Sequence, residues 1–129
     1  MALTLSIFDE TTSGTRSRAG AFCFETESLT LRELIRRRVE QEVERFNESD
    51  VPVFRGLVQP GETERILNGV RERPVLDWQK QYAKAITAFE GNGFLVFVDG
   101  RQITKLDERL ELTAETNVAF LKLVPLVGG

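Results

Sequence analysis

Histidine is missing from this chain of 129 residues, and cysteine, tryptophan and tyrosine occur once each. Without histidine, composition alone excludes a histidine general base, a Ser–His–Asp triad and most zinc sites. The one cysteine, Cys23, cannot form a disulfide within the chain, which agrees with a reducing compartment. Cys23 alternates with Phe22 and Phe24 and has no flanking base to activate it, so we interpret it as a structural or solvent-facing thiol.

Long apolar runs are lacking as well. No run approaches the roughly 18 residues that a membrane span needs, and no basic segment followed by an apolar stretch opens the sequence. We therefore expect a soluble cytoplasmic protein without a membrane partner. The 17 basic and 20 acidic residues give a net charge of −3, which argues against general binding to a phosphate backbone, so no nucleic-acid partner is expected.

Enzyme motifs are not found in the sequence. The chain has no G-x-x-x-x-G-K-[ST] loop for nucleotide phosphates and no catalytic constellation. We therefore expect no enzymatic activity of its own, no bound cofactor and no metal site.

Hydrophobic residues make up 41% of the chain, enough for one domain with a core, and the length is too short for two. We expect a single domain over residues 1–129. Apolar residues alternate along residues 3–8, which predicts a first strand. A small, polar stretch up to Gly20 precedes the alternating Phe22 and Phe24, so the two runs predict a hairpin with a long loop.

Residues 30–46 carry the clearest helix pattern. Thr30-Leu31-Arg32-Glu33 fits a capping box, in which the threonine and glutamate side chains satisfy free amides at the helix start. The basic run Arg36-Arg37-Arg38 has glutamates four residues after its first and last members, so we interpret it as a solvated helix face. An apolar stripe about four turns long is formed by Leu31, Leu34, Ile35, Val39, Val43 and Phe46.

The second half of the chain alternates irregular and regular segments. Proline and glycine punctuate residues 48–75 and leave room for a short helix around 63–70. A helical stripe over 76–89 stops at Gly91-Asn92-Gly93, and we interpret its Trp78 and Tyr82 as core anchors. Residues 94–98 and 101–103 predict a hairpin around Asp99-Gly100. A linking segment over 106–112 and a turn over 113–117 precede a closing strand over 118–124.

The sequence ends on Gly128-Gly129, after this closing strand and a short apolar tail. Pro125 lacks an amide hydrogen and so ends the strand, which frees Leu126 and Val127 for burial by a partner. Two residues without side chains can thread a carboxylate into a narrow active site of another protein. These features predict that the Gly129 carboxylate is the reactive group, with an ordinary frayed terminus as the alternative.

The order of strand, strand, long helix, strand, short strand and final strand, followed by Gly-Gly, resembles the ubiquitin-like β-grasp family. Residues 94–129 look like the second half of ubiquitin, and residues 3–46 look like its first hairpin and helix. The Pro-Leu-Val-Gly-Gly tail over 125–129 is also similar to that of the small sulfur carriers of molybdopterin and thiamin synthesis. Unlike ubiquitin, the chain has no arginines before the glycines.

This resemblance implies an α+β, ubiquitin-like β-grasp fold, with a mixed sheet packed on one long helix. A helical insertion of roughly 45 residues, about 48–92, would replace a short connection of ubiquitin.

The function implied by the resemblance is that of a bacterial type of ubiquitin-like protein modifier. An activating enzyme would use ATP and Mg to adenylate the Gly129 carboxylate at the end of the Gly128-Gly129 pair. The chain would then pass as a thioester to a conjugating enzyme and a target protein. Two alternatives stay open: a sulfur-carrier protein that forms a C-terminal thiocarboxylate, and a β-grasp protein-interaction domain that is never activated.

The closing strand also suggests a surface for partners. Phe120 and Lys122 share one face of this strand, and we take the lysine as the mark of the outer face. A β-grasp sheet leaves one face open, so apolar residues there are expected to form a docking patch. The alternative is that the insertion covers this face and makes it part of the core. The predicted partner-binding residues are Phe97, Phe120, Val124, Pro125, Leu126 and Val127.

Overall fold

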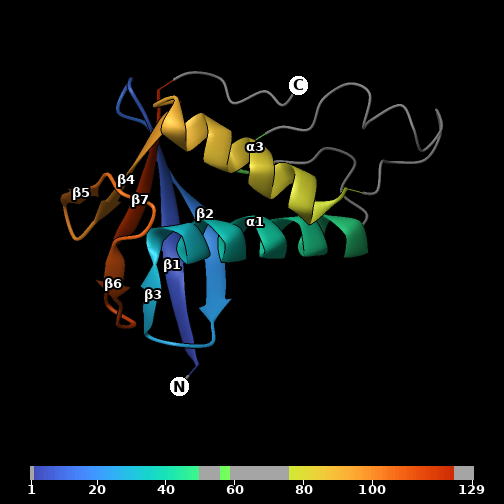
Figure 1. Cartoon of the computed structure of the whole chain (residues 1–129), viewed down its shortest axis with the longest axis horizontal. Helices are drawn as coiled ribbons and strands as arrows, with labels where there is room; N and C mark the ends of the chain where they lie inside the picture. The colour runs from blue at the N-terminus through green and yellow to red at the C-terminus, as the bar shows by residue number, and fades with distance from the viewer. Residues whose placement is uncertain (1, 50–55, 59–75, 124–129) are drawn as a thin grey trace.

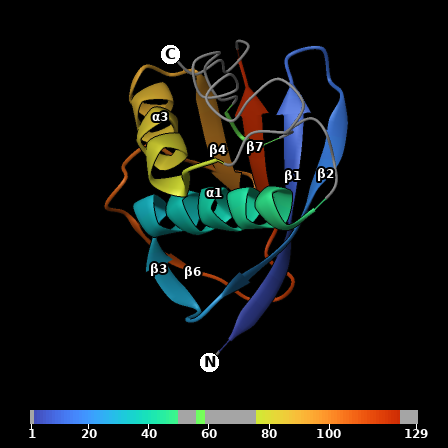
Figure 2. The same ribbon diagram turned by 90° about the vertical axis from the view of Figure 1, so that its right-hand side faces the viewer.

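The computed structural model describes residues 2–49, 56–58 and 76–123. They form an α+β fold in which two helices lie against a five-stranded mixed sheet (Figure 1). The predicted fold class is confirmed at this level, and the architecture is compatible with a β-grasp-like fold. Figure 2 shows both described helices on the same side of the sheet, so no described helix covers its other face.

The sheet has the strand order β2-β1-β7-β4-β5. Its strands are β1 (Leu3–Thr11), β2 (Arg16–Phe24), β4 (Phe94–Val98), β5 (Arg101–Ile103) and β7 (Val118–Lys122). β1 and β7 pair in parallel, and the remaining neighbours in this order pair antiparallel. Since strands β1 and β7 come from opposite ends of the chain, the centre of the sheet joins the two halves of the sequence.

The first hairpin has a shorter loop than the sequence predicts. β1 continues to Thr11 and β2 starts at Arg16, so only residues 12–15 connect them. The pairing continues through polar residues such as Glu10 opposite Arg16, which have no apolar alternation to reveal a strand. The predicted hairpin at Asp99-Gly100 is confirmed: the φ angles of these residues are +50° and +83°, as a two-residue turn of this type requires.

A second ladder was not evident from the sequence pattern. β3 (Ser28–Thr30) pairs antiparallel with β6 (Arg109–Glu111), with Leu29 opposite Leu110. The sequence predicts only a linking segment over 106–112, because three residues are too few to display a period of two. The ladder places the start of the long helix beside the segment that leads to β7.

The long helix α1 (Leu31–Glu48) begins where the capping box predicts. Thr30 Oγ1 accepts a hydrogen bond from the Glu33 N–H at 3.2 Å, and the Glu33 carboxylate accepts one from the Thr30 N–H at 3.4 Å. All six residues of the predicted apolar stripe are buried in the core. The capping box and the stripe are therefore confirmed.

Replacing Thr30 with alanine should lower the free energy of unfolding by about 1 kcal/mol, because the Glu33 N–H loses its acceptor. The denaturation midpoint followed by circular dichroism measures this change. The exposed Thr104→Ala serves as a control for loss of a threonine hydroxyl. An unchanged midpoint in Thr30→Ala would show that the capping box does not stabilise α1.

The second helix, α3 (Trp78–Glu90), packs beside α1. Asp77 caps its start by accepting a hydrogen bond from the Gln79 N–H at 2.9 Å. Trp78 and Tyr82 are only half-buried, so they lie at the margin of the core and are not fully enclosed anchors. The prediction that this helix packs on the body is confirmed. Its half-buried residues in contact with the core are Trp78, Tyr82, Ile86, Ala88 and Phe89.

The expected insertion over about 48–92 is described only in part, at residues 48–49, 56–58 and 76–92. The short helix predicted around 63–70 lies outside the described residues. The described parts of this region, α3 and residues 56–58, lie against the body: Leu57, Val58 and Leu76 belong to the hydrophobic core.

Candidate functional site

The end of β7, from which the predicted tail continues, lies within the described residues. The Leu123 N–H donates to the Gly93 carbonyl at 3.0 Å, which ties the end of β7 to the turn between α3 and β4. The predicted activated end, Gly128 and Gly129, lies outside the described residues. The same holds for the predicted partner-binding residues Val124, Pro125, Leu126 and Val127.

A buried arginine ties α1 to the sheet next to this end. Arg38 has no exposed surface and donates to the two carboxylate oxygens of Asp9 at 2.7 and 2.8 Å. It also donates to Glu42 Oε2 at 3.2 Å. Lys122 Nζ, at the end of β7, lies 3.4 Å from Asp9 Oδ2. We call Arg38, Asp9, Glu42 and Lys122 the charge network; it joins α1, β1 and β7.

The interpretation of Arg36-Arg37-Arg38 as a solvated helix face is wrong for Arg38. Helical spacing contained the signal, because Arg38 lies four residues after Leu34 and seven after Leu31, on the buried stripe. The expected pairing of Arg38 with Glu42 is present, but it occurs inside the protein, where a carboxylate partner offsets the cost of burying the guanidinium charge.

Burial and charge act in opposite directions on the pKa values of this network. Burial raises the pKa of the Asp9 carboxyl, but hydrogen bonding and attraction by Arg38, together with Lys122, hold it below its ordinary value of 3.8. Burial lowers the pKa of Arg38, whereas Glu42 and Asp9 raise it above its ordinary value. Both groups are therefore ionised at neutral pH.

Three side chains hold the short segment Gly56–Val58 beside the same end of β7. Lys122 Nζ donates to the Gly56 carbonyl at 3.5 Å, and Glu42 accepts a hydrogen bond from the Leu57 N–H at 3.0 Å. Gln81 of α3 donates to the Val58 carbonyl at 3.1 Å. The segment itself is buried. Side chains from α1, α3 and β7 thus hold this part of the expected insertion next to the strand end from which the tail continues.

Phe120 belongs to the core, and its assignment to a partner-binding patch is wrong. It is 0% exposed, and its ring stacks on Phe94 with centroids 5.7 Å apart. Lys122 shares its face, but the ammonium reaches back to Asp9 on the helix side of the sheet and so does not mark an outer face. The sequence correctly predicts that Phe120 and Lys122 share a face of β7. That face points toward the helices, and not outward as predicted.

The open face of the sheet carries a different apolar patch. Ala119 lies opposite Phe8 of β1 and opposite Phe97 of β4, so these three residues form a row across the central strands. Leu121 follows two residues later on the same face of β7. We call Phe8, Phe97, Ala119 and Leu121 the open-face patch. The sequence predicts Phe97 for such a surface. Leu121 was missed because the faces of β7 were exchanged, and Phe8 of β1 was not assigned to a surface.

Polar groups border this patch on one side. A hollow of about 380 Å³ has Phe97 and Leu121 in its lining together with Glu10, Arg16 and Asn117. Arg16 lies 3.3 Å from the Glu10 carboxylate, donates to Asn117 Oδ1 at 3.2 Å and stacks on the Phe8 ring at 4.3 Å. An apolar centre with a polar rim is the usual composition of a protein-docking surface.

Within residues 2–49, 56–58 and 76–123, no cluster of three or more acidic or cysteine side chains is arranged to hold a metal ion. Neither described helix has the length and apolar character needed to cross a membrane. Cys23 is exposed on β2, as a solvent-facing thiol should be. Comparisons with models of protein families, with curated proteins and with solved structures found no match to this chain.

Proposed function

We propose that the chain is a ubiquitin-like protein modifier with a β-grasp fold. Its Gly129 carboxylate is adenylated by an activating enzyme and passed as a thioester to a conjugating enzyme and a target protein. The observation that carries the proposal is the position of β7, which lies between β1 and β4 in the sheet. The tail Pro125-Leu126-Val127-Gly128-Gly129 follows this internal strand after two residues.

An internal strand is a rigid origin for a reactive tail. β7 is paired on both sides, and the Leu123 N–H is hydrogen-bonded to Gly93, so the point from which residues 124–129 continue is held in place. Six residues reach at most about 20 Å when fully extended. A partner that docks on the body can therefore hold its own active site within this reach of Leu123, and glycine at the last two positions needs the least space there.

The proposed chemistry starts from a carboxylate, which is a poor electrophile because its leaving group would be oxide. An oxygen of the Gly129 carboxylate attacks the α-phosphorus of ATP, and pyrophosphate leaves. A thiolate of the enzyme then attacks the acyl carbon, and AMP leaves with the bonding electrons. The partner supplies magnesium and the phosphate contacts, since this sequence has no phosphate-binding loop.

The open-face patch is the proposed docking surface for the activating enzyme. It combines the partly exposed aromatic rings of Phe8 and Phe97 with the polar rim around Arg16, and it lies on the sheet face that no described helix covers. Leu123, a large hydrophobic residue that is 36% exposed, follows Leu121 of the patch and precedes the tail in the sequence. Aromatic rings at the centre of an interface contribute most to affinity.

Deletion of Gly129 should abolish activation and leave the fold intact, because this residue follows the last described strand, β7, by seven residues in the sequence. ATP–pyrophosphate exchange by the cognate activating enzyme measures activation, and the melting curve serves as the folding control. Wild-type exchange by the truncated chain would contradict a reaction at the Gly129 carboxylate.

Intact mass spectrometry of the same reactions separates the candidate functions. The mass of the purified natural protein first establishes that Gly129 carries its terminal carboxylate. A thioester between this carboxylate and the enzyme supports the modifier, whereas conversion to a thiocarboxylate identifies a sulfur carrier. An unmodified chain with bound partner identifies an interaction domain that is not activated.

A further inference from the structure

The second half of β2 is an edge that another strand could join. β2 lies at the end of the strand order, and residues 19–24, Ala-Gly-Ala-Phe-Cys-Phe, contain no charge and no proline. An edge strand presents backbone N–H and C=O groups to any incoming strand, and an uncharged sequence offers no repulsion against it. Such an edge needs protection from another part of the chain.

Gln41 of α1 occupies the place of a neighbouring strand at this edge. Its Oε1 accepts a hydrogen bond from the Cys23 N–H at 2.9 Å, and its Nε2 donates to the Cys23 carbonyl at 2.7 Å. One carboxamide thereby makes both hydrogen bonds that a residue of an added antiparallel strand would make. Gln41 is 7% exposed, so the amide is buried in this position and is not a mobile surface group.

Arg45, one helical turn further along α1, protects the next residue of β2 whose backbone groups point away from β1. Backbone groups of alternate residues point to the same edge of a strand, so Ala21 faces outward as Cys23 does. Arg45 Nη2 donates to the Ala21 carbonyl, and its guanidinium lies 4.9 Å from the centre of the Phe22 ring. The contact is close: a Cβ atom on Gly20 would lie 3.2 Å from Arg45 Nη1.

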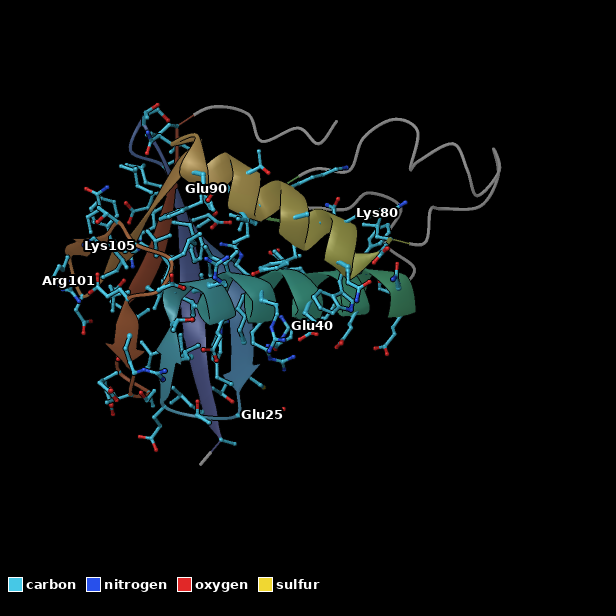
Figure 3. All side chains as sticks on the ribbon, viewed as in Figure 1. Glu25, Glu40, Lys80, Glu90, Arg101 and Lys105 are labelled. Carbon is cyan, nitrogen blue, oxygen red and sulfur yellow. The ribbon has the colours of Figure 1, made fainter. Side chains whose placement is uncertain are left out.

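The remaining edges of the five-stranded sheet are protected in other ways. The first half of β2 carries Arg16 and Arg18, and its pairing with β1 is interrupted by an irregularity next to Gly20. The opposite edge, β5, has only three residues, and Arg101 and Lys105 project at this margin of the sheet (Figure 3). Short edges, irregular pairing and charged side chains all oppose strand addition. Among the described edges of the five-stranded sheet, the stretch 19–24 is the one that side chains of α1 close.

We propose that Gln41, together with Arg45, closes the edge over residues 19–24 and so prevents a second copy of this chain from pairing through β2. A second copy is the expected occupant because two identical antiparallel edges satisfy each other around a twofold axis, with the same residues contributing from both sides. This role is independent of any reaction at Gly129.

The test is the oligomeric state of Gln41→Met. Methionine keeps the length and volume of the side chain and removes both hydrogen-bonding groups. In sedimentation equilibrium the wild type should remain at the monomer mass of 14.6 kDa at every concentration. The apparent mass of Gln41→Met should rise with concentration toward twice this value. Glu44→Met, on an exposed position of the same helix, is the matched control and should stay monomeric.

A second substitution tests whether association uses β2. Ala21→Pro removes the outward N–H of the edge and is compatible with an edge strand, so Gln41→Met with Ala21→Pro should return to the monomer mass. A folded Gln41→Met that stays monomeric at all concentrations would overturn the proposal, and so would a dimer that survives Ala21→Pro. If Gln41→Met fails to fold, Gln41→Glu retains the acceptor for Cys23, loses the donor, and is judged by the same two outcomes.

Discussion

Phe120→Ala should lower the free energy of unfolding by about 3–5 kcal/mol, the usual range for removal of a buried phenylalanine ring. The ring is 0% exposed, stacks on Phe94 and lies 4.6 Å below the Arg38 guanidinium. Its loss leaves a cavity between the sheet and α1 and removes a contact of the charge network. Since small domains have about 5–15 kcal/mol of stability, this variant should be close to unfolding. Urea denaturation measures the change.

Phe97→Ala is the matched control, because it removes the same ring from the opposite face of the sheet. Phe97 is only partly buried, so its loss should change the free energy of unfolding by about 1 kcal/mol. Under the proposed function, it should instead raise the KM for the activating enzyme with little change in kcat. Equal losses of stability in the two variants would contradict the assignment of Phe120 to the core and Phe97 to the surface.

Arg38→Met should also lower the free energy of unfolding by about 3–5 kcal/mol, because Asp9 and Glu42 lose the charge that compensates their burial. The exposed Arg36→Met, two residues away on α1, should have a small effect and controls for the change in net charge. Arg38→Lys keeps the charge but loses the two parallel hydrogen bonds to Asp9, so an intermediate loss is expected. Equal stability of Arg38→Met and wild type would contradict this role for the network.

The pH dependence of unfolding is part of the same prediction. The pKa of Asp9 in the folded state lies below its ordinary value of 3.8, so folding favours the ionised carboxylate. This contribution to stability is complete above about pH 5 and is lost as the pH falls through 3.8 toward the folded-state pKa. In Asp9→Asn the loss of stability over this acid range should be smaller than in the wild type. Parallel curves for the two proteins would show that Asp9 does not titrate in this way.

Local patterns in the sequence determined the two described helices and most of the described strands, but not all of their boundaries. The capping box at Thr30 and Glu33 sets the start of α1, because its two hydrogen bonds connect residues only three apart. Asp99-Gly100 sets the β4–β5 turn for the same reason, since its backbone angles depend on those two residues alone. The candidate tail was likewise found from sequence, as the composition of residues 125–129 is its only signal.

Only the tertiary structure decided which way each face points. Alternation along β7 shows that Phe120 and Lys122 share a face, but it contains no information on the side that the helices cover. That side depends on contacts between β7, β1 and α1, whose residues are far apart in the chain. The same reason applies to the burial of Arg38 against Asp9, to the ladder of β3 with β6 and to the protection of Cys23 by Gln41. Each requires a specific partner from a distant segment, and a pattern within one segment cannot identify that partner.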